Sequence, residues 1–161
     1  MKAEYVNSFY KATKDVFQLM IDTDPKRSDL RAVENIESSR YANVLLRVIG
    51  DLEGTILFSF PKDTALEMVK IMSGMDMDKI DSFASSALGE VANIIGGNAL
   101  TSLAESSCIC DIKTPEIFLG GFNSLTLVNE KALLLTLAAP IGEFDITISL
   151  KEKRSLDGAA S

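Results

Sequence analysis

Hydrophobic residues recur with a helical period in the first part of the chain and with a strand period in the part that follows. Between residues 5 and 21 they lie three or four positions apart, which predicts an amphipathic helix that ends near Pro25. Residues 42–50 and 55–60 alternate apolar and polar side chains. This alternation predicts two strands, joined by a hairpin loop at residues 50–54.

Two further helices and a strand-rich segment follow the hairpin. Pro61 suits a first helical turn and Gly74 suits a helix end, so a short helix is expected up to Met72. A long helix is expected from about Asp81 to Glu105. The remaining strands are predicted at residues 107–113, 124–128, 132–139 and 143–150.

These elements predict an α+β fold in which helices, one of them long and central, pack against a mostly antiparallel sheet. Alternating apolar and polar residues in the last predicted strand support this, because that pattern is typical of a sheet with one buried and one wet face. The chain has no internal repeat or dividing linker, so we expect a single domain over residues 1–150. Residues 151–161 are expected to form a fraying polar tail.

The long helix is predicted to have one buried and one exposed face. At about 100° per residue, the core face consists of Leu88, Val91, Ala92, Ile95, Ala99 and Leu103. The opposite face consists of Ser82, Ser86, Glu90, Asn93, Gly97 and Thr101. Glu90 and Asn93 lie one turn apart and can reach a single partner group, with Ile94 and Leu100 at the borders of this face. A carboxylate and an amide bordered by apolar side chains resemble a docking surface, although such residues usually only solvate a helix.

Gly96 and Gly97 lie in the middle of the long helix, where each glycine costs about 1 kcal/mol relative to alanine. Two adjacent glycines indicate a bend or the close approach of another backbone. From the sequence, packing within the protein and contact with a partner explain them equally well.

Composition and charge argue against several functions. The 161 residues carry a formal net charge of −7, so a primary role in nucleic-acid binding is not expected. The N-terminus lacks the apolar core of a signal peptide, and no segment approaches the roughly 20 apolar residues that span a bilayer. We therefore expect a cytoplasmic protein without membrane insertion, and cysteines that are buried and reduced.

The available side chains restrict the chemistry. The sequence contains no histidine, which excludes Ser–His triads and His-ligated zinc sites within this chain. Asp76, Asp78 and Asp81 raise the question of a magnesium or calcium site, but turn and capping roles are favoured because the calcium-loop pattern is missing. No metal site is predicted. Any catalysis must use carboxylates, amides, hydroxyls or thiols.

Residues 86–97, Ser-Ala-Leu-Gly-Glu-Val-Ala-Asn-Ile-Ile-Gly-Gly, resemble the signature of the CheC, CheX and FliY family of chemotaxis phosphatases. The family pattern is Asp or Ser, three residues, Glu, two residues and Asn, which Ser86, Glu90 and Asn93 fit. A proline expected about twenty residues later has a candidate in Pro115, one residue short of the family spacing. The chain has one such motif and the length of a stand-alone domain, so it is most similar to CheX. The similar order of helices and strands extends over nearly the whole chain.

The resemblance implies a phosphatase that docks on a phosphorylated response-regulator receiver domain of the CheY type. It implies that Asn93 orients the attacking water and that Glu90 pairs with a lysine of the receiver. Ser86, Ile94, Gly97 and Leu100 would then contact the partner. The receiver would supply Mg²⁺, so no cofactor of the chain's own is expected, and a homodimer whose sheets join across subunits is implied.

Two other classes of function fit the same residues. The chain could be a receiver-binding or flagellar and chemotaxis adaptor without catalysis, which uses the helix surface only for attachment. It could also be a purely structural dimeric domain, because its strand-rich half could pair between subunits. The presence of both Glu90 and Asn93 favours the phosphatase.

Overall fold

The computed structural model describes residues 1–120, 126–127 and 129–153. Its helices are α1 (Ala3–Met20), α2 (Lys62–Ser73) and α3 (Ser82–Ala104). Its strands are β1 (Lys26–Val33), β2 (Ile36–Glu37), β3 (Ala42–Gly50), β4 (Leu52–Phe60), β5 (Cys110–Ile112), β6 (Glu116–Leu119), β7 (Thr126–Leu127), β8 (Ala132–Ala139) and β9 (Gly142–Glu152).

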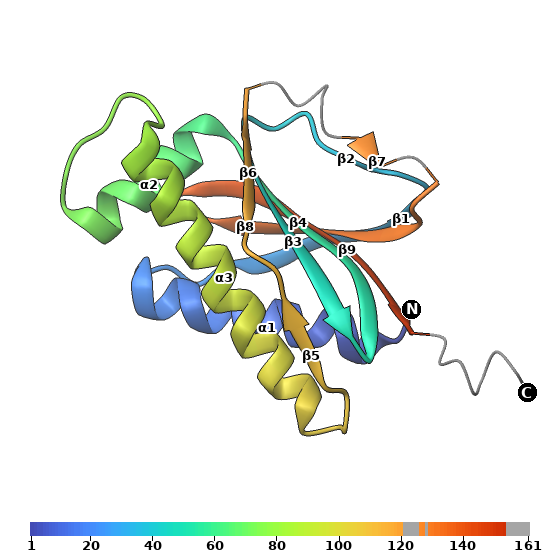
Figure 1. Cartoon of the computed structure of the whole chain (residues 1–161). Coiled ribbons are helices and arrows are strands. Elements are labelled where there is room, and N and C mark those ends of the chain that lie inside the picture. The colour runs from blue at the N-terminus through green and yellow to red at the C-terminus, as the bar shows by residue number, and fades with distance from the viewer. Residues whose placement is uncertain (121–125, 128, 154–161) are drawn as a thin grey trace, which may run out of the picture.

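One main sheet organises the molecule. Its strand order is β1-β8-β9-β4-β3-β5, with β6 also paired to β3, and each of these pairs is antiparallel. The three helices lie on one side of this sheet (Figure 1). The predicted α+β fold, with a long helix against an antiparallel sheet, is therefore confirmed.

The two faces of the sheet bury different clusters. On the helix face, Leu46, Ile56 and Ile148 lie side by side across β3, β4 and β9, and the Phe144 ring stacks on Phe17 of α1 at 4.8 Å between centroids. The opposite face carries a smaller cluster under β2 and β7, formed by Ile36, Leu45, Leu57 and Ala132 with Val33, Phe118 and Leu127 at its edge. Burial on both faces explains why the central strands contain few exposed positions.

The three predicted helices are confirmed, and each ends within a few residues of its expected bounds. α2 ends as expected at Gly74, whose backbone is left-handed (φ 75°) and whose N–H donates to the Lys70 carbonyl oxygen. None of the described helices is long and apolar enough to cross a membrane.

The strands follow the predictions less closely. The hairpin of β3 and β4 is confirmed, with Val48 paired to Gly54. β1, β2 and β6 were not predicted. The strand expected at 107–113 is confined to Cys110–Ile112, because Ser107 has a left-handed backbone (φ 68°) that interrupts an extended run. Of the strand expected at 124–128, Thr126–Leu127 forms β7 and the rest lies outside the described residues.

The predicted start of the polar tail at residue 151 is wrong. β9 continues to Glu152, where Lys151 pairs with Glu53 and Glu152 pairs with Leu52. The neighbouring strand β4 begins as early as Leu52, so it provides backbone partners for these two polar residues. Residues 154–161 of the predicted tail lie outside the described part of the chain.

Candidate functional site

α3 packs against the sheet and against the other two helices. Its first turn is capped by Asp81, whose Oδ1 accepts a hydrogen bond from the Ala84 N–H at 2.9 Å. The helix packs on β3, β5 and β6 and contacts both α1 and α2 (Figure 1). All six residues predicted for its core face are buried. The helical period therefore fixes which side of α3 is available to a partner.

The two adjacent glycines of α3 have different surroundings. A Cβ at Gly96 would lie 2.8 Å from Leu46 Cδ1 and 3.1 Å from Ile112 Cδ1, so the helix can rest on β3 and β5 only because this position has no side chain. A Cβ at Gly97 would meet nothing within 4 Å, and Gly97 is exposed. Internal packing thus accounts for Gly96 but not for Gly97.

The exposed side of α3 is unusually poor in charge. Glu90 is the one charged residue among the 23 of this helix. A solvent-facing helix side normally carries several Lys and Glu residues, whereas surfaces that become buried against a partner are depleted of charge. Here the exposed positions are mainly small and uncharged, namely Ser82, Ser86, Gly97, Asn98, Thr101 and Ser102. This composition indicates a surface that a partner can desolvate at low cost.

The three residues of the sequence motif lie together on this side. Ser86 and Glu90 are exposed and Asn93 is half-buried, at spacings of four and three residues that place them on consecutive turns. None of the ion pairs among the described residues includes Glu90. The side-chain hydrogen bonds found along α3 in the described structure are those of Asp81 and Thr101. The Glu90 carboxylate and the Asn93 amide are therefore free to bind an external group.

Pro115 lies in the short connector between β5 and β6. Ile112, at the end of β5, faces Gly96, and Ile117 of β6 faces Gly89, where a Cβ would lie 3.2 Å from Ile117 Cδ1. The connector therefore passes the part of α3 between Gly89 and Gly96, the part that holds Asn93. Pro115, the candidate for the distant proline, therefore lies in a connector that passes the part of α3 holding the motif.

One predicted contact residue is misplaced. Leu100 is 7% exposed and belongs to the main core, so the expectation that its side chain borders the exposed face is wrong. The helix is covered over a wider arc than a division into two equal faces assumes, because β5 and β6 pack against it in addition to β3 and the other two helices. Ile94 is half-buried and packs against the core with part of its surface.

Phe83 is an exposed residue of α3 that the sequence reasoning missed. Its side chain is 48% exposed in the first turn of the helix. The available signal was its spacing, because Phe83 precedes Glu90 by seven residues and so lies on nearly the same line of the helix.

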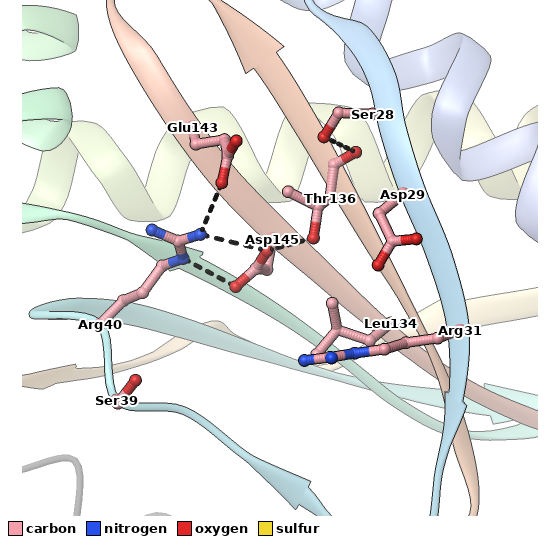
Figure 2. Close-up of a pocket in the computed structure, with 9 residues that line it drawn as sticks. All are labelled: Ser28, Asp29, Arg31, Ser39, Arg40, Leu134, Thr136, Glu143 and Asp145. Atoms are coloured by element: carbon pink, nitrogen blue, oxygen red, sulfur yellow. Dashed lines mark hydrogen bonds and ion pairs between the residues drawn. The ribbon is translucent and has the colours of Figure 1, made fainter.

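A polar pocket lies on the opposite face of the sheet, away from the motif (Figure 2). It has a volume of about 630 Å³ and includes Arg40, Thr136, Glu143 and Asp145. Arg40 Nε donates to Asp145 Oδ2 at 2.7 Å, and Thr136 Oγ1 donates to Asp145 Oδ1 at 2.8 Å. These polar groups are largely satisfied by one another. The bonds to Asp145 therefore hold the segment around Arg40 on the sheet, and the pocket is not a continuation of the α3 surface.

The acidic connector before α3 and the two cysteines have local structural roles. Asp76 pairs with Lys70 at 3.2 Å and Asp81 caps α3, in agreement with the favoured turn and capping roles. Cys108 and Cys110 are free thiols, as expected, but both are half-buried and not fully buried. Cys110 Sγ accepts a hydrogen bond from the Leu52 N–H at 3.3 Å.

The sequence of this chain is similar to that of a known group of proteins. The model of the family described as "Chemotaxis phosphatase CheX" matches residues 43–138. The CheY-P phosphatase CheX of Thermotoga maritima is 27% identical over 157 residues, which cover 94% of this chain and 98% of that protein. The CheY-P phosphatase CheC of Bacillus subtilis is 36% identical over 69 residues, 40% of this chain and 33% of that protein.

Solved structures show the same fold. A CheC-like superfamily protein from Shewanella has a TM-score of 0.84 at 19% identity, covering 94% of this chain and 99% of that chain. The chemotaxis protein CheX from Vibrio vulnificus has a TM-score of 0.83 at 22% identity, covering 92% and 100%. A chain of the CheX–CheY–BeF₃–Mg²⁺ complex from Borrelia burgdorferi has a TM-score of 0.72 at 23% identity, covering 92% and 98%.

Proposed function

The chain belongs to the CheX family of chemotaxis phosphatases, and from this premise we propose that it docks α3 on a phosphorylated CheY-like receiver domain and promotes hydrolysis of its aspartyl phosphate. The observation that carries the proposal is the exposed side of α3, where Glu90 and the free Asn93 amide stand together on an otherwise uncharged surface. The relative from Thermotoga maritima is named a CheY-P phosphatase. This is the chemistry that a carboxylate and an amide can support without a nucleophile of their own.

The proposed reaction requires a water molecule to be aimed at phosphorus. The water attacks the phosphoryl group, the bond between phosphorus and the receiver's aspartate oxygen breaks, and the products are inorganic phosphate and a free carboxylate. The Asn93 amide has both a carbonyl oxygen that accepts and an NH₂ group that donates hydrogen bonds. It can therefore hold the water in line with the bond that breaks. α3 positions this amide more rigidly than a loop would.

Glu90 is assigned to docking. Its carboxylate lies three residues from Asn93, so both side chains can enter one receiver pocket together. A lysine in that pocket would pair with Glu90 and set the depth to which Asn93 enters. Ser86, one turn before Glu90, has a minor positioning role, and Gly97 leaves room for the partner's surface.

The Mg²⁺ that the reaction needs is assigned to the receiver. The exposed side of α3 provides a single carboxylate, Glu90, and magnesium is usually bound through one or two carboxylates together with phosphate oxygens and waters. A receiver that is already phosphorylated provides those ligands. We place the protein in the cytoplasm together with this class of substrate.

The test is the rate of phosphate loss from a phosphorylated receiver in the presence of Mg²⁺. Wild-type protein should accelerate it, and Asn93→Ala should reduce kcat on the order of 10² or more, with a modest change in KM. Asn98→Ala is the matched control, because Asn98 is an exposed asparagine on the same helix but points about 140° away from Asn93. Equal rates for wild type and Asn93→Ala would remove Asn93 from the mechanism. Binding without acceleration by the wild type would support the adaptor instead.

We also propose that the chain forms a homodimer through β1. This strand lies at the edge of the main sheet, and seven of its eight residues are exposed. Antiparallel pairing of two β1 strands about Leu30 would place Asp29 opposite the partner's Arg31 on both sides of the symmetry axis. The charge pattern of this edge is therefore complementary to itself.

Charge reversal tests the dimer. Arg31→Asp should produce monomers in light scattering, because it places two carboxylates opposite each other. The double variant Asp29→Arg, Arg31→Asp should restore the dimer, and Lys151→Asp, an exposed charge change on β9, should leave it unchanged. A monomeric wild type, or a double variant that stays monomeric, would contradict pairing through β1.

A further inference from the structure

The ring of Phe83 continues the line of the proposed docking residues. Seven residues span 700° of helical rotation, so Phe83 and Glu90 differ by only about 20° in direction, and Gly97 follows after the same interval. In α3, all of which the structure describes, Phe83 is the one large apolar residue with an exposed side chain. An aromatic ring, a carboxylate and a glycine thus follow one another along the exposed side of α3.

Folding of α3 does not require a phenylalanine at this position. The first turn is capped through the Asp81 carboxylate and the Ala84 N–H, and the core contacts of this end are made by the buried residues Ala84 and Leu88. Phenylalanine is also a poorer helix former than alanine or leucine. Its half-exposed ring is thus not explained by the helix or by the core.

We propose that Phe83 is an aromatic anchor that binds the receiver outside the phosphoryl pocket. This inference rests on the proposed function and adds a residue to the docking surface. At 1.5 Å per residue, Phe83 lies about 10 Å from Glu90 and about 15 Å from Asn93 along the helix axis. The ring is therefore too far from the phosphoryl group to take part in the reaction. It contacts an apolar part of the receiver surface beside the pocket.

The surroundings of Phe83 suit this role. Aromatic side chains are enriched in interfaces and often contribute a large share of the binding energy when the neighbouring groups exclude water. Ser82 and Ser86 are small and uncharged, and Ala87 is half-buried, so within α3 a partner that covers the ring meets no charge before Glu90. Glu90 and Asn93 then determine the register of the complex, and Phe83 contributes to its affinity.

The experiment compares Phe83→Ala, Phe83→Leu and Ile109→Ala with the wild type. Ile109 is the matched control, because it is a large apolar residue that is 63% exposed but lies beyond the far end of α3. Two quantities are measured: the Kd for a receiver loaded with BeF₃ and Mg²⁺, and kcat and KM with the phosphorylated receiver. Circular dichroism confirms that each variant is folded.

We expect Phe83→Ala to raise Kd and KM about tenfold with kcat within about twofold of the wild type. Phe83→Leu should recover most of the affinity, because leucine retains an apolar side chain of similar reach. Ile109→Ala should bind like the wild type. Unchanged Kd in Phe83→Ala, or a fall in kcat at constant Kd, would overturn the anchor. A wild type that neither binds nor dephosphorylates the receiver would overturn the proposed function together with the anchor. This outcome differs from failure of the anchor alone, in which the wild type is still active.

Discussion

Replacing Gly97 by alanine should change stability and activity in opposite directions. A Cβ at this exposed position meets nothing within 4 Å, so the substitution adds helix propensity without a clash. The expected gain is about 1 kcal/mol in the free energy of unfolding, because glycine in a helix interior is less favourable than alanine by that amount. For a chain of this length the gain corresponds to a rise in Tm of roughly 2–4 °C.

Docking should respond in the other direction. If the receiver's surface approaches α3 at Gly97, the new methyl group separates the two surfaces where they are closest. We expect kcat/KM to fall about tenfold, which equals about 1.4 kcal/mol of lost binding. Thermal unfolding measures the first effect, and the rate of phosphate release from the receiver measures the second.

Gly96→Ala is the matched control for the same chemical change one residue earlier. There the added methyl meets Leu46 and Ile112 inside the protein, and overpacking of a core costs typically 1–3 kcal/mol, which cancels or exceeds the gain in propensity. This variant should be no more stable than the wild type. A Gly97→Ala protein that is stabilised and fully active would show that Gly97 does not approach the partner. A Gly97→Ala protein that is less stable than the wild type would refute the expectation that a Cβ at this position meets no other atoms.

Three further predictions concern individual side chains. Glu90→Gln should raise KM, and the difference in KM between variant and wild type should shrink at high ionic strength, because salt screens the pairing with the receiver's lysine. Glu105→Gln, just beyond α3, is the control. A difference in KM that does not depend on salt would argue against the ion pair. Burial raises the pKa of the Cys108 thiol, so iodoacetamide should modify it more slowly in the folded than in the urea-unfolded protein at pH 7.5, as followed by mass spectrometry; equal rates would contradict this. A hydrogen bond from Lys14 lowers the pKa of Asp24, so this carboxylate stabilises the fold above its unfolded value of 3.8, and the stabilisation is lost as pH falls through the lower folded value. The difference in urea unfolding between wild type and Asp24→Asn should accordingly be present at pH 7 and vanish at strongly acidic pH; a difference that persists there would exclude the ion pair as its source.

The helices could be predicted because their signals are local. The period of α3 identifies its buried side from a few turns of sequence, and an Asp at the start and a Gly after the end of a helix are short-range signals. β1 has no comparable signal. Its sequence, Lys-Arg-Ser-Asp-Leu-Arg-Ala-Val, is mostly polar because it is an edge strand, and it is held by backbone hydrogen bonds to β8, which lies about a hundred residues later.

The candidate site shows the same limit. Ser86, Glu90 and Asn93 could be placed on one side of α3 from spacing alone. The burial of Leu100 could not, because it depends on how many elements pack around the helix. The roles of Gly96 and Gly97 could not be separated either, since only the positions of β3 and β5 show which glycine faces the interior.

The lack of charge on α3 connects its composition to the proposed chemistry. An acyl phosphate is already activated, so under the proposed function the main task of the visiting protein is to place a water molecule correctly. Such placement depends on close contact between two surfaces, and every extra charge on α3 would have to lose its water when the receiver binds. A helix side with one carboxylate, one free amide and small neighbours meets this requirement. The same reasoning implies that introducing lysine at Ser82 or Thr101 should weaken docking even though both positions are exposed and tolerate it in the folded protein.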